Sequence, residues 1–278
     1  SKVLKSACEQ AADGTRPGNR LCRCGGRAGR LRSSLFMKLD FPDGDFAGYI
    51  FDLDGTLSLG GALLEGTLVL MERLRVTKRP SAYVTNNSSR SAHDVAVKAR
   101  KLGIGVPDGH AITSGAAAVE YLRDKRNDRR VFVLGTPSLE QEVLAGGLEL
   151  DAHNPDAVLL GMDLTLTYEK LAHATHLIAR GVHFVATHPD LLCPSPKGQV
   201  PDCGALAAAL TAATGIEPIV IGKPEAAMLE TALHRLDADP SETAIVGDRL
   251  YTDMEMGFRG GLTTILVDGG ASLGVREA

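Results

Sequence analysis

The stretch Gly48-Tyr49-Ile50-Phe51-Asp52-Leu53-Asp54-Gly55-Thr56 decides the fold of this 278-residue chain. Its apolar first half predicts a buried strand, and that strand ends in two carboxylates two residues apart. Because side chains alternate along an extended strand, Asp52 and Asp54 share one face, where their charges repel each other unless a cation lies nearby. Magnesium together with a phosphorylated substrate would supply such a cation site at the end of the strand.

Three further segments place polar residues just past a predicted strand. They are Thr85-Asn86-Asn87-Ser88-Ser89-Arg90-Ser91 after residues 82–84, Gly222-Lys223-Pro224-Glu225 after residues 218–221, and Gly247-Asp248-Arg249-Leu250-Tyr251-Thr252-Asp253 after residues 243–246. A single segment of this kind is moderately specific, because acidic residues and glycine also form ordinary turns and calcium loops. All four segments in this order favour one shared site.

The four segments resemble the motifs of the haloacid dehalogenase (HAD) superfamily, whose phosphatases use an aspartate as nucleophile. The second, third and fourth segments are similar to the branch that contains NagD-type nucleotide and sugar phosphatases, p-nitrophenylphosphatases, phosphoglycolate phosphatase and pyridoxal phosphate phosphatase. The resemblance runs from about residue 45 to residue 268 and includes residues 155–163 and 166–171. It implies an α/β fold, in which a doubly wound parallel-sheet, Rossmann-like core carries an inserted α/β cap between the second and third motifs.

The spacing of apolar runs agrees with that architecture. From residue 48 onward, short apolar runs alternate with helical patterns, which is typical of a parallel sheet covered by helices on both faces. Core strands are expected at residues 48–51, 82–85, 219–221, 244–246 and 264–267.

The interval between the second and third motifs is too long for one crossover connection and predicts a domain of its own. Strands are expected there at residues 131–135, 157–161 and 183–187, with a helix over residues 168–180. We therefore expect a core of residues 37–111 and 202–278 and a cap of residues 112–201.

The resemblance also implies roles for the acidic residues. Asp52 would attack phosphorus and form an aspartyl-phosphate, while Asp54 would protonate the leaving group and then activate water. Mg²⁺ would be held by the Asp52 carboxylate, the Asp54 backbone carbonyl and the Asp248 carboxylate. Asp253 would support the water shell of the metal or orient Lys223.

The remaining predicted site residues are hydrogen-bond donors and one cation. Thr85 offers a hydroxyl, and Asn86 offers backbone and side-chain amides, which suit phosphoryl oxygens. Lys223 would balance the charge of the crowded carboxylates and of the transferring phosphoryl group. These residue types in this order predict a phosphoryl-transfer site.

A further loop of interest follows the third predicted cap strand, at His188-Pro189-Asp190. The resembling branch usually has asparagine at position 188, so this chain departs from it there. Two interpretations stay open: the loop contacts the leaving group through His188 and Asp190, or Pro189 simply sets a strand-to-loop turn. His173 and His176 lie three residues apart on a predicted helix, but no third metal ligand has suitable spacing.

Residues 1–36 differ from the rest of the chain, because they are rich in arginine and small residues and have no clear apolar period. We expect this segment to be disordered and to carry no catalytic residue. It is interpreted as an extension added upstream of the native start, as an organellar transit peptide, or as a basic arm. Met37 would make a sensible start.

Composition narrows the class of partner. A net charge of −4, aromatic residues at 4% and the absence of tryptophan give no support for a nucleic-acid partner. The apolar runs are short and broken, so no membrane partner is expected. The expected partner is a small phosphorylated metabolite, the expected location is cytoplasmic, and a homodimer formed through the cap is expected by analogy with the branch.

The sequence thus predicts a Mg²⁺-dependent phosphatase of small phosphate monoesters that works through an aspartyl-phosphate. Sugar phosphates, nucleoside monophosphates, phosphoglycolate, pyridoxal phosphate and p-nitrophenyl phosphate all stay open as substrates. A phosphomutase and a catalytically idle, phosphometabolite-binding regulator are the alternatives. A dehalogenase is disfavoured because it leaves Asp54 and Asp248 without a role.

Overall fold

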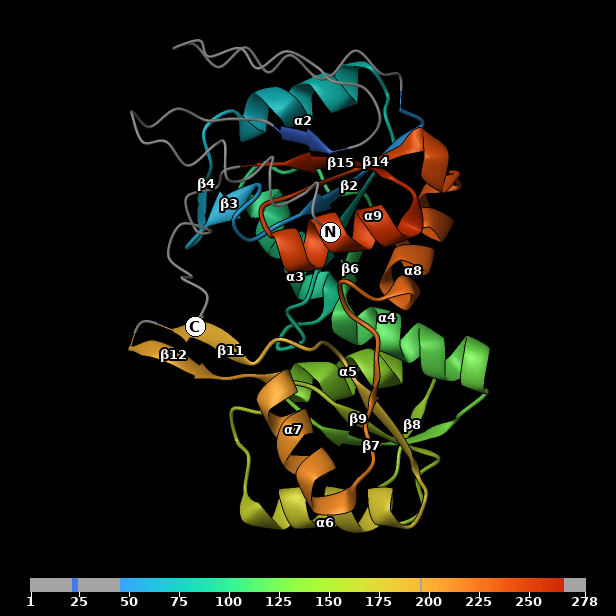
Figure 1. Cartoon of the computed structure of the whole chain (residues 1–278). Coiled ribbons are helices and arrows are strands. Elements are labelled where there is room, and N and C mark those ends of the chain that lie inside the picture. Colours follow the sequence, from blue (N-terminus) through green and yellow to red (C-terminus); the bar gives the residue numbers. More distant parts are fainter. Residues whose placement is uncertain (1–21, 25–45, 196, 268–278) are drawn as a thin grey trace.

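The computed structural model describes residues 22–24, 46–195 and 197–267, and in them two β-sheets each lie between layers of helices (Figure 1). The first sheet has the strand order β1-β15-β14-β2-β5-β6, and every pair in it is parallel except β1 with β15. Its strands are β1 (Cys22–Cys24), β2 (Gly48–Asp52), β5 (Ser81–Thr85), β6 (Ala111–Thr113), β14 (Thr243–Gly247) and β15 (Thr263–Leu266).

Apolar side chains cover both faces of this sheet. On one face Tyr49 and Phe51 of β2 pack with Tyr83 of β5. The ring centroids of Tyr49 and Phe51 lie 5.9 Å apart, and those of Phe51 and Tyr83 lie 5.8 Å apart. Ile50 points to the opposite face and packs in a different apolar cluster. Because helices bury both faces, the strands read as nearly continuous apolar runs.

Helices cover the two faces of the first sheet. The helices on the Tyr49 face are α2 (Thr67–Val76) and α3 (Ala92–Lys101), and those on the Ile50 face are α4 (Ser114–Glu120), α8 (Ala226–Leu236) and α9 (Glu255–Gly260). The start of α3 is fixed by Ser91, whose hydroxyl accepts a hydrogen bond from the Asp94 amide at 3.1 Å. Short helical turns follow α4 at Tyr121–Arg126, precede β14 at Pro240–Glu242 and precede α9 at Leu250–Met254.

The second sheet, which with its helices we call the insert (residues 130–220), is parallel throughout and has the order β13-β10-β9-β7-β8. Its strands are β7 (Arg130–Leu134), β8 (Glu149–Leu150), β9 (Ala157–Leu160), β10 (His183–Ala186) and β13 (Ile219–Val220). Helices α6 (Tyr168–Ala179) and α7 (Cys203–Thr214) cover one face, and α5 (Pro137–Ala145) covers the other. Helices α4 and α5 lie between the two sheets, so one apolar cluster runs from the first sheet into the insert (Figure 1).

Two small hairpins complete the described chain. The first joins β3 (Ser58–Leu59) to β4 (Ala62–Leu63) directly after Asp54, and the second joins β11 (Leu192–Ser195) to β12 (Gly198–Pro201). The second hairpin projects from the insert on the side that faces the first sheet (Figure 1).

The structure confirms the predicted α/β class with its parallel sheets and flanking helices. One predicted core strand is wrong, because Ile219–Val220 pairs with β10 of the insert rather than with the first sheet. The reason is that α7 packs its Ala207 and Leu210 on the insert, so the chain leaves the insert only at about residue 221. Residues 202–220, predicted in the core, therefore lie in the insert, and β6 crosses the predicted boundary at 112.

The prediction for residues 1–36 is wrong for Cys22–Cys24, which form an antiparallel edge strand beside β15. The rest of that prediction lies outside the described residues. None of the helices in the described part of the chain combines the length and the apolar character needed to span a lipid bilayer.

The close packing of α9 on the first sheet gives a stability prediction. A Cβ added at Gly257 would lie 2.4 Å from Ile245 Cγ2 and 2.6 Å from Thr264 Cγ2. Gly257→Ala should therefore lower the free energy of unfolding by about 1–3 kcal/mol, since overpacking forces neighbours to move. Gly105→Ala is the matched control, because nothing lies within 4 Å of its added Cβ. Denaturant unfolding of both variants measures the difference, and equal stability of the two would contradict this packing.

Candidate active site

The predicted site residues converge at one edge of the first sheet. Asp52 ends β2, Thr85 ends the neighbouring β5, and Asp248 directly follows β14 on the other side of β2. The carboxyl ends of these parallel strands meet at the point where the chain connections diverge to either side of β2, which is where open α/β sheets bind ligands. Lys223 reaches the same place on the segment that returns from the insert.

Lys223 is buried between two carboxylates. Its ammonium group contacts Asp52 Oδ1 and lies 2.7 Å from Asp253 Oδ1, and the whole residue is only 3% exposed. The other oxygen of Asp52 accepts a hydrogen bond from the Thr56 hydroxyl at 3.2 Å. The Asp52 carboxylate is thus held at both oxygens at the end of its strand.

The charges of this cluster do not balance. The pKa of Asp52 is raised to about 7: burial is the largest cause, Asp253 and Asp248 add to the rise, and Lys223 acts against it. Burial and Asp253 likewise raise the pKa of Asp248. Burial lowers the pKa of Lys223, but Asp253 and Asp52 outweigh this and hold it above its ordinary value. Three carboxylates around one ammonium group therefore leave an excess of negative charge.

This excess fits a divalent cation. Asp52, Asp248 and Asp253 each offer a carboxylate oxygen, and these oxygens lie within 4.8 Å of one another. Hard cations such as Mg²⁺ and Mn²⁺ prefer oxygen ligands of this kind. Gly55, at φ +98°, leaves room for the cluster, because a Cβ there would lie 2.3 Å from Asp248 Oδ2. The residues present therefore suit a divalent metal.

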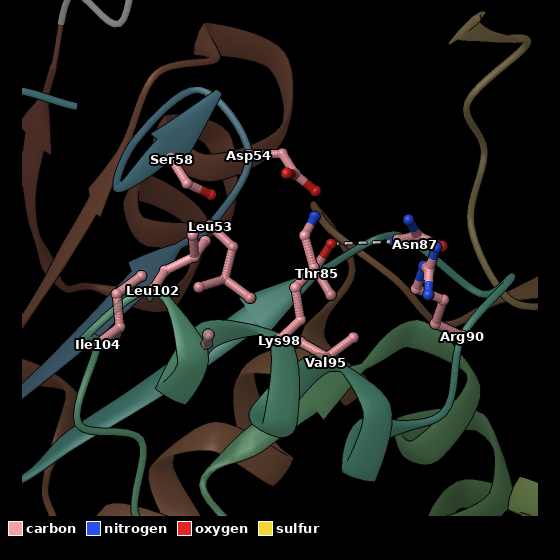
Figure 2. A pocket seen from close by; sticks show the side chains of 11 residues that line it. Leu53, Asp54, Ser58, Thr85, Asn87, Arg90, Val95, Lys98, Leu102 and Ile104 are labelled. Atoms are coloured by element: carbon pink, nitrogen blue, oxygen red, sulfur yellow. Dashed lines mark hydrogen bonds between the residues drawn. The ribbon is translucent and has the colours of Figure 1, made fainter. Parts of the chain in front are cut away.

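Asp54 differs from Asp52 because its side chain is exposed. It lines a pocket together with Thr85, Asn87, Arg90 and Lys98 (Figure 2). Figure 2 shows the Asp54 carboxylate and the Lys98 side chain reaching the same opening, while Thr85 Oγ1 accepts a hydrogen bond from the Asn87 amide at 3.2 Å. A carboxylate that is open to solvent beside a buried one suits exchange of protons with water or a leaving group.

Two cations that line this pocket were not predicted as site residues. Arg90 lies within the second motif, and Lys98 lies in the second turn of α3. A further cation, Arg249, directly follows Asp248 and interacts electrostatically with Asp52 and Asp190. Its position inside the fourth motif was the feature of the sequence that could have identified Arg249 as a site residue.

Asn86 has a different surrounding from the one predicted for its side chain. Its amide Nδ2 donates to the Lys223 carbonyl at 3.0 Å and to Asp190 Oδ2 at 3.1 Å, and its Oδ1 accepts from the Lys223 amide at 2.8 Å. The side-chain amide is thus engaged by protein groups, which is at odds with a role as phosphoryl donor. It ties the second motif to the Lys223 segment instead.

His188 and Asp190 are not among the residues that line the pocket beside Asp54. His188 is 2% exposed, and its ring lies near Asp190, Asp202 and Ser88. Asp190 bonds to Asn86, as described above. Two neighbours of His188, Ser88 and Asp202, were not predicted as site residues, and only their contacts across the fold single them out.

Comparisons with known proteins agree with this geometry. Residues 49–149 match a family model described as haloacid dehalogenase-like hydrolase, and residues 220–276 match a second model of HAD-like hydrolases. The chain is 35% identical over 227 residues to the 5'-nucleotidase YutF of Bacillus subtilis, covering 82% of this chain and 89% of that protein. It is 36% identical over 229 residues to the acid sugar phosphatase of Staphylococcus haemolyticus, covering 82% and 87% of the two chains.

Solved structures show the same similarity. A putative nagD protein superimposes with a TM-score of 0.75 at 40% identity, covering 79% of this chain and 87% of that one. The 4-nitrophenylphosphatase of Thermotoga maritima gives a TM-score of 0.75 at 40% identity, with 79% and 85% covered. NagD from E. coli K-12 gives a TM-score of 0.73 at 30% identity, with 79% and 86% covered.

The contact between Gly55 and the acidic cluster gives a prediction about metal binding. Gly55→Ala should weaken the affinity for Mg²⁺ or Mn²⁺ at least about tenfold, because the added Cβ displaces Asp248. Gly61→Ala is the matched control, since Gly61 also has a positive φ of 88° but nothing lies within 4 Å of its added Cβ. Calorimetric titration with either metal measures the difference. Equal affinities of the two variants would show that Asp248 takes no part in metal binding.

Proposed function

This chain belongs to the haloacid dehalogenase-like hydrolase family, in its NagD-like branch, and we propose that it is a Mg²⁺-dependent phosphatase of small phosphate monoesters that works through an aspartyl-phosphate. One observation carries the proposal: a buried carboxylate, Asp52, held by Lys223 and Thr56, stands beside an exposed carboxylate, Asp54, at one strand end. The names of the relatives, a 5'-nucleotidase, an acid sugar phosphatase and a 4-nitrophenylphosphatase, support the same reaction class.

In the first step an oxygen of Asp52 attacks phosphorus, and the bond from phosphorus to the ester oxygen breaks. Asp54, in its protonated form, gives its proton to the leaving alkoxide. Lys223 favours the ionised form of Asp52, which is the nucleophilic form, and so acts against the rise in pKa that burial and the neighbouring carboxylates cause.

In the second step Asp54, now a carboxylate, takes a proton from water as that water attacks phosphorus. The bond between phosphorus and the Asp52 oxygen breaks, which releases inorganic phosphate and restores Asp52. Because Asp54 is exposed, water reaches it once the leaving group has gone. One residue thus acts as acid and then as base, as microscopic reversibility allows.

Mg²⁺ would be held by the carboxylates of Asp52 and Asp248 and by the backbone carbonyl of Asp54, and when bound it offsets the negative charge of the phosphoryl oxygens. Asp253 lies within the same cluster and also holds Lys223, so it orients the ammonium group toward Asp52. The Thr85 hydroxyl and the backbone amide of Asn86 are the proposed donors to phosphoryl oxygens.

The proposal is tested by phosphate release from p-nitrophenyl phosphate, sugar phosphates, nucleoside monophosphates, phosphoglycolate and pyridoxal phosphate, each with Mg²⁺ and with EDTA. We expect release that requires the metal. Asp52→Asn should lower kcat at least about a thousandfold, since loss of a nucleophile removes the covalent route. Asp108→Asn is the control, because its carboxylate is 98% exposed and lies on a loop before β6, outside the acidic cluster.

Other outcomes would replace the proposal. Release that persists undiminished in Asp52→Asn would remove this residue as nucleophile. Transfer of the phosphoryl group between two positions of a substrate, without release, would identify a phosphomutase. Binding of the esters by a folded protein without any turnover would identify the phosphometabolite-binding regulator. A homodimer formed through the insert as cap, and a cytoplasmic location, stay predictions.

A further inference from the structure

His188 lies at the junction of three segments that are distant in sequence. The ring Nδ1 lies 3.4 Å from Asp190 Oδ2, and the ring Nε2 lies 3.5 Å from Asp202 Oδ1 and 3.3 Å from Ser88 Oγ. Asp190 belongs to the same loop after β10, Asp202 precedes α7, and Ser88 belongs to the second motif. The ring therefore joins the insert to the loop that borders the proposed nucleophile.

The positions of the two carboxylates indicate the charge of the ring. Each ring nitrogen faces a carboxylate oxygen, and an ionised carboxylate only accepts hydrogen bonds. The two carboxylate contacts have ion-pair distances, and Nδ1 has no hydrogen-bond partner among the described residues. The imidazolium form places positive charge beside both carboxylates, whereas a neutral ring turns one lone pair toward a carboxylate. Asp190 and Asp202 are themselves largely buried, with side chains 14% and 10% exposed, so solvent screens their charges poorly.

Further charged and titratable groups surround the ring. Burial raises the pKa of Asp190, but hydrogen bonding and attraction to His188 outweigh this and hold it below its ordinary value. Burial raises the pKa of Asp202, and His188 acts against that rise. Arg249 also acts on both carboxylates. The Cys203 thiol packs beside them, and burial raises its pKa to about 11, so it stays neutral.

The junction connects to the catalytic segment through Asn86. Asp190 Oδ2, which faces the ring, also accepts from Asn86 Nδ2 at 3.1 Å. Asn86 in turn holds both the amide and the carbonyl of Lys223, and the Lys223 ammonium contacts Asp52. A displacement of Asp190 would therefore reach Lys223 through one side chain.

Close backbone contacts leave this junction little freedom. A Cβ at Gly222 would lie 2.6 Å from both Asn86 Oδ1 and Thr187 O. A Cβ at Gly204 would lie 2.1 Å from the carbonyl oxygen of Pro189, so α7 packs directly against the loop. Small shifts of the loop are thus transmitted to its neighbours rather than absorbed.

We propose that His188 is a positioning residue, whose imidazolium neutralises Asp190 and Asp202 and thereby fixes Asn86 and the Lys223 segment in their catalytic arrangement. This proposal rests on the proposed function for its kinetic readout. It assigns the ring a role through charge at the junction of insert and first sheet, without contact to substrate. Loss of the ring charge leaves two buried carboxylates facing each other, which loosens the hold on Asn86.

Charge rescue tests the proposal. His188→Asn should lower kcat/KM about tenfold, because it removes the cation and leaves a poorly compensated buried pair. Asp202→Asn in the same protein restores the net charge of the cluster, and kcat/KM should recover at least about threefold relative to the single variant. Asparagine is as good as aspartate at a helix N-cap, so Asp202→Asn keeps the start of α7. His176→Asn, at an exposed position of α6, is the control and should match the wild type.

The double variant separates charge from packing, because it carries no histidine at the junction and has one carboxylate fewer. A double variant no more active than His188→Asn would overturn the proposal.

A measurement without substrate keeps this test independent of the proposed function. The ¹⁵N chemical shifts of the His188 ring, assigned by their absence from the double variant, should show both nitrogens protonated at the pH of the kinetic assay. A ring nitrogen without a proton at that pH would overturn the proposal even in an inactive protein. Phosphate release that fails for the wild type, together with a doubly protonated ring, would instead count against the proposed function alone.

Discussion

The site depends on one buried ammonium group among three carboxylates. Lys223 contacts Asp52 and Asp253, and Asp248 completes the acidic cluster. A buried ion pair costs several kcal/mol in desolvation, so its geometry and its further partners decide whether it is tolerated. Here the partners come from strand ends on either side of β2 and from the segment that leaves the insert. The first sheet and the return of the chain at residue 221 are thus what make the chemistry of the site possible.

The sequence predicted the parts of this arrangement that follow from strand ends. Asp52, Thr85 and Asp248 each follow an apolar run, and parallel strands bring such positions to one edge. The same pattern could not show in which sheet Ile219–Val220 would pair, because two residues of a strand carry no information about their neighbour. The pairing of Ile219–Val220 follows from α7, because α7 packs on the insert and the chain therefore returns to the first sheet only after residue 220.

The sequence also could not predict which side chains contact each other when they are distant along the chain. Asn86 carries the right groups to bind phosphate, and only its contacts with Lys223 and Asp190 show that its amide is already engaged. His188 could be read as a substrate contact or as a turn residue, and its burial between Asp190 and Asp202 favours neither. Burial and pairing depend on which segments meet in space, and spacing along the chain does not determine that.

The central claim is that Asp52 becomes phosphorylated, and the most direct measurement is to trap that state. Asp54→Asn slows the attack of water, so brief mixing with p-nitrophenyl phosphate and Mg²⁺ followed by an acid quench should leave one phosphoryl group on the peptide that contains Asp52. Mass spectrometry of the digested protein locates it. Phosphate release at a measurable rate with no phosphoryl group on that peptide, or with the group on another residue, would contradict the account.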